Sequence, residues 1–236
     1  MSKMISELSV FFPAYNEEAH IGETIRRAII VLEKVADKWE IVVVDDGSKD
    51  TTGRIVQSLA KDEKRIKLVT HAPNRGYGAS LKSGFYNSRY SWIAFTDSDG
   101  QFDFSEITKL IKTRDATGAD LIVGYYLKRS VPFYRKLNTF LWQIIVRMLF
   151  GLKVRDIDCG FKLISKKVID KIPKLESERG AFISSEFLIK AQKYGFKIVE
   201  VGVHHYPRVA GKGTGADFNV IVKSFIDLFK LWRKLR

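Results

Sequence analysis

The stretch from Glu40 to Ser48 reads EIVVVDDGS, and it decides the fold class of this chain. Its β-branched run has no polar interruption, whereas a strand exposed on one face would alternate apolar and polar residues. Strands buried on both faces are typical of parallel sheets that helices cover on either side. The run ends at Asp45 and Asp46, so it also places two carboxylates at the carboxyl end of a buried strand.

The same pattern repeats along the first half of the chain, where short apolar runs alternate with stretches of helical periodicity. This alternation predicts βα units and a mostly parallel sheet. The predicted strands cover 8–12, 40–44, 66–69, 92–95 and 120–124, and the predicted helices cover about 20–36, 51–61 and 104–117, with another that follows the loop 73–78 and runs to about 88. We expect Pro13 to break the first strand, because proline has no N–H to donate to a sheet.

Polar side chains follow four of the predicted strands at the point where each strand ends. They are Asn16 and Glu17, Asp45 and Asp46, Asn74 and Arg75, and Asp97 and Asp99. In an open α/β sheet, ligands bind beyond the carboxyl ends of the strands. The sequence therefore predicts one crevice that holds all four groups.

The second half of the chain changes character and contains two amphipathic segments. Residues 135–150 carry a wide apolar stripe flanked by basic residues, and residues 218–236 carry another. Between them we expect a strand or strand pair over 154–164, a helix over 184–194, a strand over 197–206 and a basic loop over 208–215. The C-terminal helix fits two situations equally well, packing on its own domain or lying in a membrane interface.

Length, charge and cysteine content limit the class of protein. The chain has 236 residues, one cysteine and a formal net charge of +13, so its surface attracts nucleic acid, anionic lipid or phosphorylated substrates. Charge alone does not choose among these partners. A disulfide framework, a secretory signal and a membrane-spanning segment are all missing from the pattern, which favours a cytoplasmic protein that contacts a membrane peripherally at most.

Ser91 to Phe102, SWIAFTDSDGQF, contains the residues that favour metal chemistry most directly. Asp97 and Asp99 are carboxylates spaced i, i+2 at a strand end, followed by Gly100, and such a pair can turn its oxygens toward one hard cation such as Mg²⁺ or Mn²⁺. The same letters also describe an ordinary polar turn. The metal interpretation gains weight from the carboxylates at the neighbouring strand ends.

Four motifs in order along the chain resemble those of the family 2 glycosyltransferases. They are Val10 to Glu17 (VFFPAYNE), Val43 to Asp50 (VVDDGSKD), Asn74 to Ser80, and Asp97-Ser98-Asp99. The resemblance covers nearly the whole chain. It implies the GT-A fold, an α/β architecture with a mostly parallel central sheet flanked by helices, here with amphipathic helices in the C-terminal half.

Within that family, the chain looks most like the polyprenyl-phosphate (dolichol-phosphate) mannosyl- and glucosyltransferases. The similarity lies in Asp99 to Phe102, Pro132 to Leu137, Asp156 to Lys162 (DIDCGFK), Glu186, and Glu200 with Arg208 to Gly211. It implies metal-dependent, inverting transfer of mannose or glucose from GDP-mannose or UDP-glucose to a polyprenyl phosphate at the cytoplasmic membrane face. We expect a nucleotide-sugar part at about 1–125, an acceptor part at about 126–215, and a separate basic amphipathic helix at 216–236.

The residues and the resemblance together assign roles around the donor. We expect the nucleotide-sugar to contact residues at three strand ends and in the loop before the third helix: Pro13, Tyr15, Glu17, Asp45, Asp46, Arg75, Asp97 and Ser98. Asp97 and Asp99 would bind the cation, and the resemblance adds Gln101 to its ligands. A divalent ion is needed because these carboxylates would otherwise repel the diphosphate.

The acceptor phosphate needs cations more than it needs a base, because it is already anionic at neutral pH. Arg135, Arg208 and Lys212 are the candidates. Asp156 would orient these arginines or act as a base, so that the expected catalytic residues are Asp99, Asp156, Arg135 and Arg208. The chain departs from many mannosyl members at Gly124 to Leu127 (GYYL), where their pattern G-S-R-Y has an arginine; Lys128 or Arg129 could substitute.

Two other functions compete with this interpretation. The first keeps a glycosyltransferase but gives it a glycan or protein hydroxyl as acceptor. The second is a basic nucleic-acid-binding protein whose acidic loops are only turns, and the lack of a recognition-helix or basic-aromatic motif counts against it. We therefore expect no nucleic-acid partner, while a membrane-spanning partner protein remains a candidate contact of the C-terminal helix.

Overall fold

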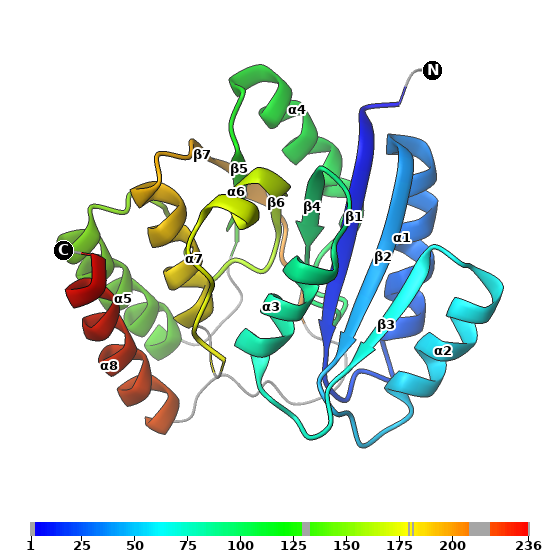
Figure 1. Ribbon diagram of the computed structural model, residues 1–236, viewed down its shortest axis with the longest axis horizontal. Helices are drawn as coiled ribbons and strands as arrows, with labels where there is room; N and C mark the ends of the chain where they lie inside the picture. The colour runs from blue at the N-terminus through cyan, green and yellow to red at the C-terminus, as the bar shows by residue number, and fades with distance from the viewer. Residues whose placement is uncertain (1–2, 129–132, 179, 181, 208–217, 236) are drawn as a thin grey trace.

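A computed structural model of the chain describes residues 3–128, 133–178, 180, 182–207 and 218–235. Its centre is a seven-stranded sheet in the order β3-β2-β1-β4-β6-β5-β7, with helices on both faces (Figure 1). The strands are β1 (Ile5–Ala14), β2 (Ala36–Asp45), β3 (Ile66–Thr70), β4 (Trp92–Phe95), β5 (Leu121–Tyr126), β6 (Lys162–Ser165) and β7 (Ile198–Val203). The helices are α1 (Ile21–Val35), α2 (Thr52–Asp62), α3 (Tyr77–Asn87), the 3-10 turn η1 (Phe104–Glu106), α4 (Ile107–Thr117), α5 (Phe133–Phe150), α6 (Lys166–Lys171), α7 (Phe182–Lys193) and α8 (Phe218–Leu235).

The two central strands are buried on both faces, as their β-branched composition predicts. In β1, Val10 and Phe12 belong to the core formed with α1, α2 and α4, whereas Phe11 belongs to the core formed with α3 and α7. In β2 the same alternation separates Val43 from Val44. The sheet therefore has a hydrophobic core on each side, and only the ends of its strands are open to ligands.

β6 is the strand that runs against all its neighbours. It pairs antiparallel with both β4 and β5, while the β1–β2, β1–β4, β2–β3 and β5–β7 pairs are parallel. In this register Lys162, the first residue of β6, lies opposite Phe95, the last residue of β4. The segment that precedes β6 is therefore brought to the carboxyl end of β4.

The sequence placed most helices and strands correctly, but it missed α6 and was wrong at two further points. Pro13 does not break β1, which pairs with β2 through Ala14. Its missing N–H is tolerated because β4 pairs with β1 only from Ser9 to Phe11, so that side of Pro13 has no strand beside it. The strand expected over 154–164 is confined to β6, and the segment before it is irregular, with a turn at Ile157 and Asp158.

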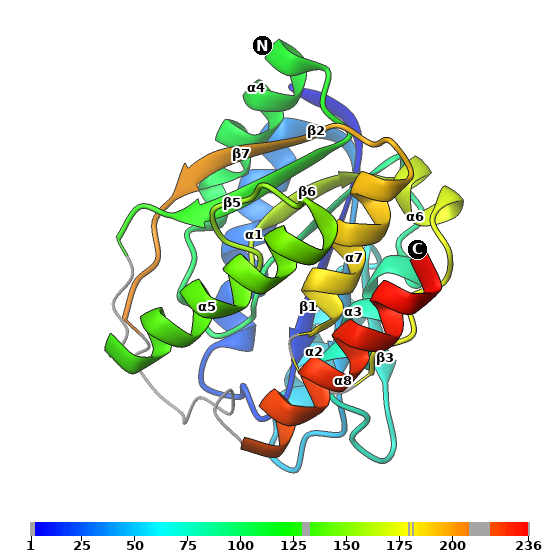
Figure 2. The same ribbon diagram turned by 90° about the vertical axis from the view of Figure 1, so that its left-hand side faces the viewer.

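The helices α5, α7 and α8 lie together beyond the β5 and β7 side of the sheet (Figure 2). Trp142 of α5 donates a hydrogen bond to Ser185 of α7 at 2.9 Å, and its ring meets that of Phe225 of α8 at a centroid distance of 5.3 Å. Leu228 and Leu231 of α8 are buried. One face of the C-terminal helix thus packs on the domain. Among the described residues, no helix is long and apolar enough to cross a bilayer.

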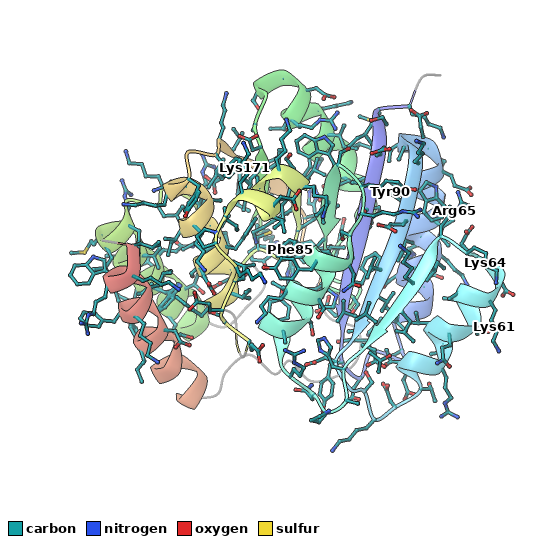
Figure 3. The ribbon with its side chains drawn as sticks, viewed as in Figure 1. Lys61, Lys64, Arg65, Phe85, Tyr90 and Lys171 are labelled. Atoms are coloured by element: carbon teal, nitrogen blue, oxygen red, sulfur yellow. The ribbon has the colours of Figure 1, made fainter. Side chains whose placement is uncertain are left out.

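An aromatic cluster joins the sheet to α3 and α7. Phe11 of β1 lies 5.0 Å from Phe85 and 5.2 Å from Phe95, and Phe85 lies 5.2 Å from Phe187, all measured between ring centroids. Figure 3 shows Phe85 on the side of α3 that faces α7. Gly84 permits this packing, because a Cβ at that position would lie 2.2 Å from a ring carbon of Phe11.

Gly84→Ala should lower the free energy of unfolding by about 1–3 kcal/mol, the usual cost of adding a methyl group to a packed core. The matched control is Gly22→Ala in α1, where the new methyl would approach no atom closer than 3.4 Å. That change should leave stability unchanged or raise it, because alanine favours helix over glycine. Urea denaturation of both variants tests the pair, and equal effects would contradict the close packing of Phe11 on α3.

Candidate active site

The main cleft lies at the carboxyl ends of β1, β2 and β4, at the edge toward which β1, β2 and β3 point in Figure 1. It has a volume of about 700 Å³. The start of α3 forms its other wall. Its lining consists of Pro13, Ala14, Tyr15, Asn16, Glu17, Asp46, Asn74, Gly76, Tyr77, Ser80, Asp97, Ser98 and Asp99. All four predicted strand ends therefore contribute to one crevice, two of them with both predicted residues and the other two through Asp46 and Asn74 alone.

Asp97 is the most strongly perturbed carboxyl group in this cleft. Burial and then the charge of Asp99 raise its pKa to about 7, and the carboxylate of Glu17 adds to the effect. The phenol of Tyr77 donates a hydrogen bond to Asp97 at 3.1 Å and opposes the shift. Burial and the negative charge of Asp97 raise the pKa of Tyr77, so the phenol keeps its proton as a donor.

The donor set suits a hard divalent cation only if the ligand completes the coordination. Asp97 and Asp99 repel each other, and a cation between them would remove that repulsion. Within the part of the chain that the structure describes, no group of three or more His, Cys, Asp or Glu side chains is arranged to hold a metal ion. The protein thus supplies a carboxylate pair, and further oxygen ligands would come from a diphosphate and from water.

Gln101, the predicted third ligand, is turned to another partner. Its side-chain amide donates to the carbonyl oxygen of Tyr206 at 2.8 Å, and its backbone N–H donates to Oδ1 of Asp99 at 3.1 Å. Tyr206 in turn donates its N–H to the carbonyl oxygen of Gln101. Gln101 does not line the cleft, and here it fixes the loop that carries Asp99.

Asp45 and Asp46 shape loops in this structure. Oδ1 of Asp45 accepts the N–H of Ser48 at 2.9 Å, and Asp45 is not part of the cleft lining. Asp46 does line the cleft, but its carboxylate accepts the backbone N–H groups of Arg75 and Gly76 at 2.9 and 2.7 Å and contacts the imidazole of His71 at 2.6 Å. Asp46 therefore holds the loop that begins α3. A role for either residue in binding the nucleotide stays a prediction.

The loop after β1 owes its shape to contacts with the loop after β2. Asn16 adopts a positive φ of 55°, and its side chain accepts the N–H of Lys49 at 2.8 Å. The N–H of Glu17 donates to the hydroxyl of Thr52 at 2.8 Å. These bonds leave Tyr15 partly exposed at the cleft and Glu17 buried beside it.

Ser98 and Arg75 are also engaged within the protein. The hydroxyl of Ser98 donates to the carbonyl oxygen of Pro13 at 2.7 Å and so ties the loop after β4 to the end of β1. The guanidinium of Arg75 pairs with Glu178 at 2.9 Å, as does the ammonium of Lys82. The sequence predicted Arg75 as a phosphate contact, and in this structure it faces the segment before α7.

Lys162, the last residue of the motif DIDCGFK, is a buried cation to which the sequence analysis assigned no role. Its ammonium group donates to the carbonyl oxygens of Ile157, at 3.2 Å, and Cys159, and burial lowers its pKa. These bonds hold the segment 157–160 beside the cleft, where a Cβ on Gly160 would lie 2.2 Å from Oδ2 of Asp97. The signal for Lys162 in the sequence was a lysine within an otherwise apolar strand. Tyr77, which contacts Asp97, was also missed, and its position between Gly76 and Gly78 was the signal that could have identified it.

The structure describes only some of the residues predicted to bind the acceptor. Asp156 is buried at the start of the segment before β6, and its carboxylate accepts the N–H of Asp158 at 3.2 Å. It does not line the cleft. Arg208 and Lys212, the side chain of Arg135, and the suggested substitute Arg129 lie outside the described residues.

Residues 9–173 match the family described as Glycosyl transferase family 2. The chain belongs to this family. Over 217 residues it is 32% identical to a dolichyl-phosphate beta-glucosyltransferase of Dictyostelium discoideum, covering 84% of this chain and 65% of that protein. The human protein of the same description is 31% identical over 221 residues, covering 84% and 67%. The chain thus spans about two thirds of the length of these relatives.

Solved structures confirm the expected fold. The glucosyl-3-phosphoglycerate synthase of Mycobacterium tuberculosis, in complex with Mn²⁺, UDP-glucose and phosphoglyceric acid, superposes with a TM-score of 0.70 at 19% identity, covering 98% of this chain and 79% of that one. The seven-stranded, mostly parallel sheet of our family 2 chain is therefore that of the GT-A fold. At this identity the likeness establishes the architecture alone.

Asp97→Asn should stabilise the metal-free protein, and the gain should grow with pH. Because the pKa of Asp97 is raised to about 7 in the folded state, the wild-type protein loses stability as pH rises from about 4 to about 7. A shift of one pKa unit corresponds to ~1.4 kcal/mol, and solvent contact reduces this value. The free energy of unfolding of the variant should therefore exceed that of the wild-type protein by about 1–3 kcal/mol above pH 7 and by almost nothing near pH 4. Urea denaturation in chelator measures the difference, with the exposed Asp62→Asn as control; a gain independent of pH would contradict the shift.

Proposed function

We propose that this chain transfers a hexose from a nucleotide-sugar to a polyprenyl phosphate, with inversion and with a divalent cation. The relatives named above support a polyprenyl-phosphate acceptor of the dolichyl type. Their names also favour glucose over mannose, and hence UDP-glucose over GDP-mannose as donor. Mg²⁺ or Mn²⁺ is the cation we propose.

The observation that carries the proposal is that Asp97, Asp99 and Glu17 line one cleft at the strand ends, where burial and then the charges of Asp99 and Glu17 raise the pKa of Asp97. A diphosphate would not enter a cleft of this charge without a cation. Asp97 and Asp99 would hold that ion, and when bound it neutralises the charge that develops on the departing nucleoside diphosphate. The phenol of Tyr77 keeps the Asp97 carboxylate in position for this task.

The remaining groups would bind and orient the two substrates. Pro13, Ala14 and Tyr15 offer a partly apolar wall for the base and ribose. An oxygen of the acceptor phosphate would form a bond to the anomeric carbon as the bond from that carbon to the diphosphate breaks, which inverts the configuration in a single displacement. Since this oxygen is already anionic, Arg135, Arg208 and Lys212 would orient it and no base needs to remove a proton.

We further propose that α5 and α8 contact the cytoplasmic face of a membrane. Eight large apolar side chains of these two helices are exposed: Phe140, Leu141, Ile144, Met148, Leu149, Phe225, Ile226 and Phe229. Figure 2 shows the two helices side by side on one side of the molecule. An apolar surface of this extent on adjacent helices is typical of a contact site for protein or lipid, and a lipid acceptor favours lipid.

Asp99→Asn should reduce transfer by a factor of roughly 100 or more, because it removes one of two ligands that neutralise the leaving group. The assay is formation of polyprenyl-phosphate hexose from radiolabelled UDP-glucose or GDP-mannose, with Mn²⁺ or Mg²⁺. Asp103→Asn, an exposed carboxylate in the same loop, is the matched control. Full activity of Asp99→Asn, or no transfer by the wild-type protein from any common donor, would contradict the proposal.

Met148→Glu combined with Phe229→Glu should weaken binding to lipid vesicles at least tenfold, because both side chains are exposed and each would place a charge in the interface. Flotation with liposomes measures the bound fraction. Ile30→Glu is the matched control, since Ile30 is equally apolar and 55% exposed but lies on α1. Equal losses in both proteins would contradict a membrane-binding face on α5 and α8.

A further inference from the structure

A second hollow lies on the far side of α5 from α8, where this helix faces the edge strand β7. It has a volume of about 390 Å³, and its walls come from the middle of α5, from residues 152–155 and from Glu200 of β7. None of its lining residues lines the cleft that contains Asp97 and Asp99. We call it the α5–β7 groove.

Positive charge predominates in the α5–β7 groove. Arg147, Lys153 and Arg155 line it and are exposed. Within the described part of the chain, neither Arg147 nor Lys153 forms an ion pair, and the guanidinium of Arg155 stacks on the ring of Tyr125 at 4.6 Å. Three cations with few competing partners form a binding site for an anion.

Glu200 is the one carboxylate among the lining residues of the groove. Its carboxylate accepts the backbone N–H of Arg155 at 2.5 Å, so it is committed to shaping the segment that carries the cations. Burial raises the pKa of Glu200 while the charge of Arg155 opposes the shift, and this single carboxylate faces the three cations of the lining. The groove therefore keeps a surplus of positive charge.

The groove also has an apolar rim that is continuous with the exposed face of α5. Phe140 and Ile144 line the groove and belong to the apolar surface described above. A ligand with a phosphate and hydrocarbon chains would place the phosphate between Arg147 and Lys153 and lay its chains along Phe140. Free phosphate or a nucleic acid would leave this rim exposed to water.

We propose that the α5–β7 groove binds the phosphate of an anionic bilayer phospholipid and so fixes how the protein sits on the membrane. The inference rests on the membrane contact proposed above and adds the lipid class and the residues that select it. The acceptor is a different lipid with a different site, because its phosphate must reach the sugar beside Asp97 and Asp99.

The test is vesicle binding by the double variant Arg147→Gln and Lys153→Gln. Vesicles of phosphatidylcholine alone are compared with vesicles containing phosphatidylglycerol, at one ionic strength and without donor, acceptor or metal. The matched control is Lys61→Gln with Lys64→Gln, which removes the same charge. Figure 3 shows these two lysines near α2, on the side of the molecule away from α5. Circular dichroism and thermal melting check that each protein is folded.

The groove variant should bind phosphatidylglycerol vesicles about 25-fold more weakly, or roughly fivefold for each cation lost near an anionic surface. The control should lose threefold or less. Equal losses in the two variants, or wild-type binding that does not depend on phosphatidylglycerol, would overturn the proposal.

Transfer to a short-chain polyprenyl phosphate in detergent separates this proposal from the proposed function. The groove variant should keep wild-type transfer in that assay. A parallel fall in transfer and vesicle binding would assign the groove to the acceptor and overturn a phospholipid site. Absence of transfer by the wild-type protein would reject the proposed function and leave the vesicle result standing.

Discussion

The close approach of the segment 157–160 to Asp97 is the constraint on which the site depends. Gly160 leaves no room for a side chain there, and the ammonium group of Lys162 holds the carbonyl oxygens of Ile157 and Cys159 from behind. This arrangement requires β6 to run antiparallel beside β4, since only then does Lys162 lie opposite Phe95, where β4 ends. A parallel strand in that place would bring its far end to the cleft. The reversed strand therefore supplies both the wall against Asp97 and a buried positive charge near it.

The carboxylates at the strand ends divide into two groups with different tasks. Asp45 and Asp46 accept backbone N–H groups and so determine the shape of the loops around the cleft. Burial, and then the nearby charges of Asp99 and Glu17, raise the pKa of Asp97, which is costly for folding and useful for binding a cation. Asp45 and Asp46 thus fix the loops that hold Asp97, Asp99 and Glu17 close together. Local features that cost stability are expected at a functional site, where the rest of the structure compensates for them.

Local sequence patterns could predict the elements and the edge of the sheet where the site forms, because periodicity and strand-end residues depend on short stretches of chain. They could not place β6 between β4 and β5, because strand order depends on pairings between distant segments. For the same reason the bond from Gln101 to Tyr206 and the pair of Arg75 with Glu178 were missed, each linking residues about a hundred positions apart. Motif letters indicated which side chains reach the crevice, and long-range contacts decide what each one touches.

The segment 174–178 connects the cleft to the helices that carry the exposed apolar face. Toward the cleft, the carbonyl oxygen of Glu178 accepts the N–H of Ala79, and its carboxylate pairs with Arg75 and Lys82. Toward the helices, the buried carboxylate of Glu186 on α7 accepts the N–H groups of Glu176 and Ser177, while Lys234 of α8 pairs with Glu176. Because the pair of Glu186 and Lys190 is buried, solvent and salt weaken it little. The orientation of the cleft relative to α8 is therefore fixed by contacts within the protein, so a surface that docks on α5 and α8 would also determine which way the cleft faces.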